Sequence, residues 1–449
     1  MQQLNIRQLA GQLSSGAISC EQMIRERLQL AAGSRGTFVR LNEDIVQQAI
    51  AVDQQRRSGA ELSPLAGVPL TLKDLFDVQG EKTLAGSKVL ENKVDTAQQD
   101  AEVVSPLREA GMLFLGRTNM SEFAFSGMGL NPNYPPLYSV WNRETGRLPG
   151  GSSSGSAVSV AEGIVPGTLG SDTAGSCRIP AAFNGITGMK PSCGRMSAQG
   201  VYPLSHSSDS AGPLAVDVDS CFLLDQLMQG KYSRDLPALT VKDLTTLKLL
   251  IPEGVVMSDL DSEVAEAFEA AVQQLENAGA EIIRQAMPVI DDCVDMFFNR
   301  NTVIHEAWEW HRELIEAHGD EYDPYVKVRI LSGQGVGEAE QAKRYAEKAA
   351  LIERFNQEKQ VLGIDALLYP TVACVPPTVA STQDADNIGA INLRCLRNTS
   401  SVNYFDGCAI SLPCHQAGSA PVGLMLSSHH GDDDRLLRMA AGIEKVLQS

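Results

Sequence analysis

The sequence has no apolar run long enough to cross a membrane, for which about 18 to 20 consecutive apolar residues are needed. Its first residues also lack the basic segment followed by an apolar stretch that marks a secretory signal. We therefore expect a cytoplasmic protein that has no membrane anchor.

Positive charge is in short supply. The chain has 37 Lys and Arg residues against 55 Asp and Glu residues, which gives a formal net charge of −18 at pH 7. A field of this sign repels phosphate backbones and anionic lipid surfaces. Nucleic acid and membrane partners are therefore disfavoured.

Motifs for metals and nucleotides are missing as well. The nine cysteines are scattered without a CxxC pair, and the seven histidines include no HExxH. Disulfide frameworks and zinc sites need clustered, regular spacing, so we expect reduced, mostly buried thiols and no metal. Neither GxGxxG after a strand nor GxxxxGK occurs, which argues against a nucleotide cofactor.

What is present is the composition of a packed globular protein. Of the 449 residues, 43% are hydrophobic and 20% are charged. Apolar strands alternate with helical patterns along the whole length, which favours an α/β sheet with helices on both faces. Neither an internal repeat nor a domain boundary is evident.

Apolar spacing and capping residues predict several elements. Two short helices are expected between Ile6 and Ala32, with a break at Ser15 and a new start where Ser19 and Gln22 fit a capping box. The later elements are a strand at Leu247–Ile251, a helix capped by Asp261, an extended segment at Glu281–Ile283, a helix at Gly337–Leu362, a strand at Asp365–Tyr369 and a final helix from Asp432 or Asp433 to Leu447.

Lys73 follows an unusual apolar run. The run from Leu65 to Leu72 is bounded by Gly and Pro and is typical of a strand buried on both faces. Burial disfavours the charged ammonium group and lowers the pKa of a lysine, which would let Lys73 act as a base. The alternative is a surface lysine at a strand end, paired with Asp74 or Asp77.

Residues 149–212 are rich in Gly and Ser but also carry apolar stretches at Ala157–Ala161 and Ile164–Leu169. A flexible linker would lack such stretches, so we expect a structured loop region.

The GSDTAGS sequence within this region has only small residues around Ser176. Small residues allow successive backbone N–H groups, here of Thr173, Ala174, Gly175 and Ser176, to converge on one point as an oxyanion hole. A serine hydroxyl needs a neighbouring base to become a nucleophile, and Lys73 could supply one. The alternative is that Gly and Ser only make tight turns.

A second serine motif is also present. Residues 151–155 fit GxSxG, the nucleophile elbow of the α/β hydrolases, with Ser153 at its centre. That motif must follow a strand and pair with a histidine. The preceding residues, WNRETGRLPG, are polar and broken by Pro and Gly, which disfavours an elbow.

Three segments together make the chain similar to the amidase signature family: GVPLTLKDLFDV around Lys73, PGGSSSGSA around Ser152 and SDTAGSCRIPAAFNGITGMKPS around Ser176. The likeness continues in order through RTNMSEFAFSG, SSDSAGPLA, DALLYPT, NYFDGCAISLPC and APVGLMLSS, and is weakest over about residues 285–360.

The resemblance implies the amidase signature fold, a large, mixed, twisted β-sheet covered by helices on both faces. It implies a single domain over residues 1–449. N-terminal helices would occupy about residues 1–60, the signature core about 64–215, and a more divergent part that closes the pocket about 240–449.

The resemblance also implies the roles of individual residues. Lys73 matches the family's base, Ser152 matches the serine that relays protons across a cis peptide, and Ser176 matches the acylated nucleophile. The positions that would hold the nucleophile loop in place are Gly151, Ser153, Asp172 and Arg178.

The activity so implied is hydrolysis of the C–N bond of a small carboxamide through a seryl acyl-enzyme, which gives a carboxylate and ammonia or an amine. The resemblance implies no cofactor and is compatible with a homodimer. The substrate pocket is expected to use Met120, Phe125 and Ser126.

Three rival functions stay open at this point. The chain could be the glutaminase-type A subunit of a tRNA-dependent amidotransferase, which would need a partner chain and would work on tRNA. Ala174 stands where most members have glycine, a variant similar to the SDTAGS of allophanate hydrolases, so a urea derivative of the allophanate or biuret type is a second candidate. An inactive binding protein is disfavoured because all three catalytic positions are filled.

Overall fold

The computed structural model describes residues 4–231 and 235–448, and within them eleven strands form one sheet. The strand order across the sheet is β1-β3-β2-β4-β6-β5-β10-β11-β9-β7-β8. The strands are β1 (Phe38–Leu41), β2 (Pro69–Lys73), β3 (Leu113–Thr118), β4 (Gly167–Asp172), β5 (Thr187–Lys190), β6 (Ser210–Ala215), β7 (Lys248–Glu253), β8 (Glu281–Ala286), β9 (Ala366–Pro370), β10 (Cys408–Pro413) and β11 (Gly423–Ser428).

The sheet is mixed. Strand β2 runs parallel to both of its neighbours, β3 and β4, and β7 runs parallel to β8 and β9. The other neighbouring pairs are antiparallel. This confirms the large mixed sheet that the family resemblance implies.

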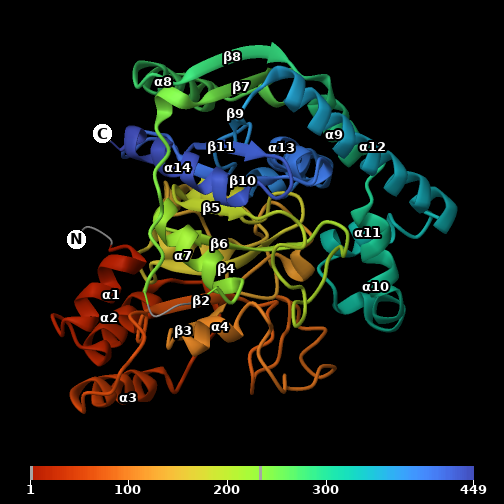
Figure 1. Cartoon of the computed structure of the whole chain (residues 1–449). Coiled ribbons are helices and arrows are strands. Elements are labelled where there is room, and N and C mark those ends of the chain that lie inside the picture. The colour runs from red at the N-terminus through yellow and green to blue at the C-terminus, as the bar shows by residue number, and fades with distance from the viewer. Residues whose placement is uncertain (1–3, 232–234, 449) are drawn as a thin grey trace.

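Helices surround the sheet. They are α1 (Ile6–Ser14), α2 (Cys20–Gly33), α3 (Ile45–Arg57), α4 (Ser105–Glu109), α5 (Ser154–Ala161), α6 (Arg178–Asn184), α7 (Val218–Met228), α8 (Ser262–Asn277), α9 (Pro288–Asn299), α10 (Val303–His318), α11 (Pro324–Leu331), α12 (Glu338–Leu362), α13 (Ala385–Tyr404) and α14 (Asp433–Leu447). In Figure 1, α1 to α3 lie at the lower left, beside the part of the sheet that contains β2 and β3, and α9 to α12 lie along the right-hand side.

Alternating side chains of the strands explain why both faces are covered. On β7, Leu249 and Ile251 pack in an apolar cluster that includes Phe268 of α8. Leu250, between them, belongs to a different cluster that includes Val294 of α9. Successive side chains of a strand point to opposite faces, so an all-apolar strand needs a helical layer on each side.

The predicted elements outside the signature region are confirmed with small shifts. The N-terminal segment forms α1 and α2, and Ser19 accepts a hydrogen bond from the Gln22 N–H at the start of α2. Asp261 does precede α8, but its carboxylate does not cap the helix. It accepts instead from the Val375 N–H and from Arg394, so tertiary contacts take the group that local sequence assigns to a cap.

The signature region is more regular than the expected loop. Residues 154–190 contain α5, β4, α6 and β5, and their connections are short. The apolar stretch at Ala157–Ala161 belongs to α5, and Ile164–Leu169 leads into β4. Glycine and serine are needed here because helices and strands approach one another closely: a Cβ on Gly170 would lie 2.7 Å from Ser153 Oγ.

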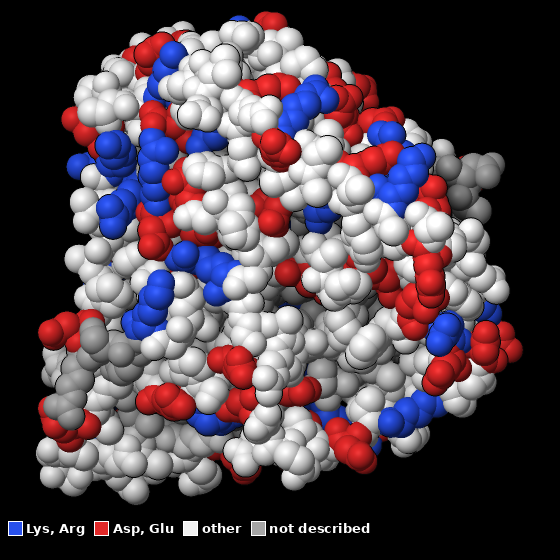
Figure 2. All heavy atoms as spheres, turned by 45° about the vertical axis from the view of Figure 1, so that its right-hand side comes forward, with Lys and Arg blue, Asp and Glu red and all other residues white. Residues whose placement is uncertain are grey.

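The surface carries charges of both signs. Figure 2 shows acidic and basic side chains interspersed on one face of the molecule. None of the helices in the described part of the chain combines the length and apolar character of a membrane span. All nine cysteines are unpaired and seven of them are buried, as the sequence predicts.

Candidate active site

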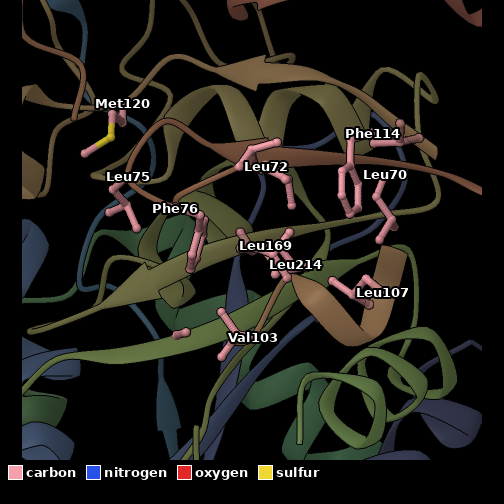
Figure 3. Close-up of a cluster of buried hydrophobic side chains, with 14 of the residues drawn as sticks. Leu70, Leu72, Leu75, Phe76, Val103, Leu107, Phe114, Met120, Leu169 and Leu214 are labelled. Atoms are coloured by element: carbon pink, nitrogen blue, oxygen red, sulfur yellow. The ribbon is translucent and has the colours of Figure 1, made fainter. Parts of the chain in front are cut away.

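Lys73 is the last residue of β2, in the parallel part of the sheet. Strand β2 pairs with β3 and β4, and the Lys73 side chain is 0% exposed. Leu70 and Leu72 on the same strand pack with Leu169 and Leu214 in an apolar cluster (Figure 3). The buried strand that the sequence predicts therefore ends in a buried lysine.

Two hydroxyl groups contact the Lys73 ammonium group. Its Nζ atom lies 2.7 Å from Ser152 Oγ and 2.7 Å from Ser171 Oγ. Burial lowers the pKa of Lys73 from 10.5 to about 7, although the negative charge of Asp172 works in the opposite direction. Close to neutral pH, a large share of Lys73 is thus uncharged and able to accept a proton. Its partner is not Asp74, because that carboxylate lies beside Arg117.

Ser152 is held by a tight approach of backbone segments. The peptide bond between Gly151 and Ser152 is cis. The Gly151 N–H donates to the Gly127 carbonyl at 2.8 Å, and the Ser152 carbonyl accepts from the Ser121 N–H at 3.1 Å. A Cβ on Gly151 would lie 2.5 Å from the Gly129 nitrogen, so only glycine fits at this position.

Ser176 lies in the short connection between β4 and α6 and is 5% exposed. Its carbonyl accepts a hydrogen bond of 3.3 Å from the Ser153 N–H. This bond joins the Ser176 loop directly to the segment that contains Ser152. The sequence-predicted trio of Lys73, Ser152 and Ser176 therefore belongs to neighbouring segments at one end of the parallel strands.

A buried ion pair holds the Ser176 loop in place. Asp172 and Arg178, both 0% exposed, lie 2.9 Å apart at their closest charged atoms. Burial alone would raise the pKa of Asp172, but the Arg178 guanidinium outweighs it and holds the pKa at about 2. Arg178 also donates to the Thr399 carbonyl at 2.9 Å and to Asn403 at 2.8 Å.

The backbone around Ser176 supplies fewer free donors than the sequence predicts. The Gly175 N–H donates to Asp172 Oδ1 at 2.8 Å, and the Cys177 N–H donates to Asp172 Oδ2 at 3.1 Å. Gly175 is thus committed to the ion pair instead of an oxyanion. For the N–H groups of Thr173, Ala174 and Ser176, the described part of the chain provides no acceptor.

Helix α13 contributes contacts that sequence reasoning missed. Thr399 Oγ1 donates to the Ala174 carbonyl at 2.7 Å, and Asn403 Nδ2 donates to Asp172 at 3.2 Å. Asn392 Oδ1 accepts from the Gly127 N–H at 2.8 Å. Ser171 was missed as well. It stands in the recognised SDTAGS segment, and the parallel pairing of β2 and β4 was the signal that could have found it, since that pairing puts both strand ends at one edge.

A small pocket opens at Ser176. Its cavity volume is about 20 Å³, and it is lined by Ala124, Phe125, Ser126, Gly127, Thr173, Ala174, Ser176, Leu204, Phe297, Asn301, Val303, Arg329 and Leu396. A larger cavity of about 260 Å³ shares Ala124, Thr173 and Leu204 with it and reaches Ser171 and Asp209. Phe125 and Ser126, which the sequence predicts as pocket residues, are among those that line the cavity with Ser176.

Met120 does not lie there. It is 0% exposed and belongs to the hydrophobic core, in the same apolar cluster as Leu75 (Figure 3). It is not among the residues that line the two cavities at Ser176, and the chain turns between Met120 and Phe125. Phe123 and Ala124 have positive φ angles of 51° and 59°, and Phe125 and Ser126, which follow this turn, line the pocket together with Ser176.

Ser153 does not lie in a nucleophile elbow. The residues before it, 148–152, do not form a strand, and α5 begins directly after it. Its hydroxyl donates to the Ser171 carbonyl at 3.3 Å, so it ties the segment to β4.

Comparison with known proteins identifies the family. The amidase family model matches residues 22–437. The chain belongs to the amidase family. It is similar to the 2-amino-5-chloromuconic acid deaminase of Comamonas testosteroni, with 33% identity over 89% of this chain and 86% of that protein. It is also similar to the A subunit of the glutamyl-tRNA(Gln) amidotransferase of Cupriavidus taiwanensis, with 31% identity over 98% of this chain and 96% of that one.

Solved structures agree. The crystal structure of an amidase matches with a TM-score of 0.87 and 30% identity, over 98% of this chain and 99% of that one. This amidase therefore has the amidase fold throughout, and it hydrolyses carbon–nitrogen bonds of amides. In the described part of the chain, no group of three or more His, Cys, Asp and Glu side chains is placed to hold a metal ion.

Proposed function

We propose that Ser176 attacks the carbonyl carbon of a small carboxamide and that Lys73, acting through Ser152, takes up the proton. The observation that carries this proposal is the 2.7 Å hydrogen bond between the fully buried Lys73 Nζ and Ser152 Oγ. A neutral lysine in this position accepts a proton from Ser152, and Ser152 accepts one from Ser176 as its oxygen forms the new C–O bond.

The second half of the reaction uses the same relay in reverse. The proton returns through Ser152 to the amide nitrogen, the C–N bond breaks, and ammonia or an amine leaves the seryl ester. Water then attacks the ester, giving a carboxylate and free Ser176. The N–H groups of Thr173, Ala174 and Ser176 are the proposed oxyanion donors because their hydrogen bonds are not used elsewhere in the described residues.

The size of the pocket supports a small substrate. The cavity beside Ser176 has a volume of only about 20 Å³, while the adjoining cavity of about 260 Å³ has room for the rest of a small molecule. Among the relatives, the name of the Comamonas testosteroni deaminase describes action on 2-amino-5-chloromuconic acid, a small unsaturated diacid. We assign this chain to small amides of the same size class, hydrolysed in the cytoplasm and without a cofactor.

The similarity to the A subunit of an amidotransferase over 98% of the chain supports a second candidate, in which this chain releases ammonia from glutamine for a partner protein. The purified chain should be assayed alone against simple carboxamides, glutamine, allophanate and biuret, with the Ser176→Ala variant as the blank. Turnover of carboxamides by the chain alone supports a free-standing amidase. Hydrolysis of glutamine only would favour the amidotransferase role.

A further inference from the structure

The side chain of Thr173, whose N–H is one of the proposed oxyanion donors, contacts a carboxylate of another segment. Its hydroxyl donates to Asp209 Oδ1 at 2.5 Å. In the antiparallel ladder of β4 and β6, Asp172 pairs with Ser210. Thr173 and Asp209 are therefore the next opposite positions, just beyond the end of the ladder. Both residues line the cavity of about 260 Å³ that adjoins the Ser176 pocket.

Asp209 is held in its own segment by backbone groups. Its Oδ2 atom accepts from the N–H groups of Leu204 and Ser205, both at 2.9 Å. The Asp209 N–H donates in turn to the Ser205 carbonyl at 2.9 Å. An aspartate that bonds to nearby backbone groups in this way closes a turn. The turn of residues 204–209 thus uses one carboxylate oxygen and presents the other, Oδ1, to Thr173.

Helices α10 and α12 fix the same turn from the outside. The buried Glu306 of α10 accepts from Ser205 Oγ at 2.7 Å and from the Ser207 N–H at 3.1 Å. The Tyr345 hydroxyl of α12 donates to Glu306 at 2.6 Å, and Lys348 Nζ of α12 donates to the Ser207 carbonyl at 2.9 Å. The carboxylate at the end of the turn is therefore an acceptor in a fixed position.

The Asp209 carboxylate is ionised under the conditions in which Lys73 is neutral. Burial raises the pKa of Asp209 to about 6, and the negative charge of Glu306 adds to the rise, whereas the three hydrogen bonds that the carboxylate accepts lower it. The pKa of Lys73 is about 7, so the lysine is mostly neutral above this pH. Asp209 is then charged, and its bond with the Thr173 hydroxyl is charge-assisted.

The other contacts of the Ser176 loop do not fix the Thr173 side chain. Thr399 Oγ1 donates to the Ala174 carbonyl and holds the next residue of the loop. The Thr173 hydroxyl has Asp209 as its one hydrogen-bond partner within the described residues. The orientation of Thr173, and with it the direction of its N–H, therefore depends on this bond.

We propose that Asp209 is a positioning residue that, through the Thr173 hydroxyl, directs the Thr173 N–H toward the oxyanion formed when Ser176 attacks the amide. This inference rests on the proposed function, because it assumes that Ser176 is the nucleophile. Donors held in place before the reaction stabilise the charge that develops in the transition state, so loosening one of them lowers kcat more than it raises KM. Asp209 itself touches no reacting atom in this account.

Two substitutions of Thr173 test the inference. Thr173→Val keeps the shape and the N–H but removes the hydroxyl. Loss of a whole oxyanion donor costs about 10²- to 10³-fold, so loosening one should lower kcat for a simple amide such as butyramide by about 10- to 100-fold and leave KM within about 2-fold. Thr173→Ser restores the hydroxyl and should recover kcat to within about 3-fold of the wild type. A wild-type kcat in Thr173→Val, or equal losses in both variants, overturns the inference.

A double-mutant cycle tests whether Asp209 acts through Thr173. Asp209→Asn has one carbonyl oxygen in place of two carboxylate oxygens, so it cannot accept from both the turn and the Thr173 hydroxyl. It should therefore lower kcat as Thr173→Val does. Combining the two substitutions should cost no more than about 2-fold beyond the weaker single variant, because both remove the same contact. Independent, multiplying losses overturn the inference.

Thr83→Val is the matched control. Thr83 Oγ1 donates to Asp77 Oδ1 at 2.7 Å, the same kind of contact, and Thr83 lines neither cavity at Ser176. This variant should keep the wild-type kcat. A loss of kcat as large as that of Thr173→Val would show that any broken threonine–aspartate bond has this effect, and it would overturn the inference.

Labelling by a fluorophosphonate separates this inference from the proposed function. The probe reacts with an activated serine and places a phosphoryl oxygen where the oxyanion would lie, so Thr173→Val should slow labelling of Ser176 at saturating probe by about 10-fold or more. A wild type that neither hydrolyses amides nor is labelled at Ser176 overturns the proposed function and this inference with it. If the wild type is labelled and Thr173→Val is labelled equally fast, the inference alone fails.

Discussion

Lys73 Nζ and Ser152 Oγ lie 2.7 Å apart although 79 positions separate them in the sequence. The contact exists because β2 ends beside β4 and because the Gly151–Ser152 segment passes against the same strand ends. It places a cation of lowered pKa against a hydroxyl group, and most of the following expectations depend on it.

The rate should depend on the charge of Lys73. Its pKa is lowered from 10.5 to about 7, and only the neutral form accepts the proton from Ser152. We therefore expect kcat/KM for an uncharged amide to be low at pH 5, to rise with one inflection near pH 7 and to level off above it. A flat profile between pH 5 and pH 9 would contradict the assignment of Lys73 as the base.

The two serine motifs predict different effects of mutation on activity. Ser176→Ala should lower kcat by a factor on the order of 10⁴ to 10⁶ without changing the circular dichroism spectrum. Ser153→Ala should cost far less, because the Ser153 hydroxyl bonds to the Ser171 carbonyl and has no catalytic part in this account. Steady-state kinetics of both variants decides the point, and a larger loss for Ser153→Ala would revive the nucleophile elbow.

Ser171 should influence the pKa of Lys73. Its hydroxyl accepts a hydrogen bond from Lys73 at 2.7 Å, which stabilises the charged ammonium. Ser171→Ala should therefore lower the pKa of Lys73 further and move the inflection of the pH profile to lower pH, with a loss of roughly 10-fold in kcat/KM from weaker positioning. An unchanged inflection would reduce Ser171 to a packing role.

Breaking the buried ion pair should destabilise the protein. Arg178→Met leaves the Asp172 carboxylate buried without its cation, and such changes cost about 3 to 5 kcal/mol. The free energy of unfolding, measured by urea denaturation of the variant and the wild type, checks this value. Arg284→Gln, which removes an exposed pair with Glu269, should cost less than about 1 kcal/mol and serves as the control. Equal costs would mean that the buried ion pair does not stabilise the fold.

The Asp172–Arg178 ion pair should also make the stability of the folded protein depend on pH. The pKa of Asp172 is about 2 in the folded state and 3.8 in its ordinary range. The unfolded chain therefore binds the proton first, and the stability from this pair is full above pH 3.8 and is lost as the pH falls toward 2. Between these values, Asp172→Asn should show a shallower loss of urea midpoint than the wild type, and parallel curves would contradict the linkage.

The sequence was sufficient for the elements whose signal is local. The apolar approach to Lys73, the small residues around Ser176 and the alternating strands all act through neighbours in the chain, and hydrophobic periodicity reports them directly. The mixed sheet of the family fold came from the resemblance, and the order of the strands was not predicted. The expectation of a loop region between residues 149 and 212 was wrong because a Gly- and Ser-rich composition also suits closely packed strands and helices.

Contacts between distant segments could not be predicted. Ser171, Thr399 and Asn403 have ordinary sequence surroundings, and their importance follows only from the packing of α13 and β4 beside the Ser176 loop. The Gly175 N–H was expected to contribute to the oxyanion hole. It donates instead to the Asp172 carboxylate, which is a strong acceptor because it is charged, and the sequence does not reveal this contact. Arg329 lines the pocket at Ser176, and its place there could not be predicted because it lies in the part of the chain where the resemblance is weakest.

Covalent labelling of the wild-type protein tests the central claim most directly. After exposure to a fluorophosphonate probe, peptide mapping by mass spectrometry should find one modified residue, Ser176, and labelling should be lost in Ser176→Ala and slowed strongly in Lys73→Ala. A probe adduct on Ser152, Ser153 or any other residue, or undiminished labelling without Lys73, would contradict a nucleophile at Ser176 that is activated by a buried lysine.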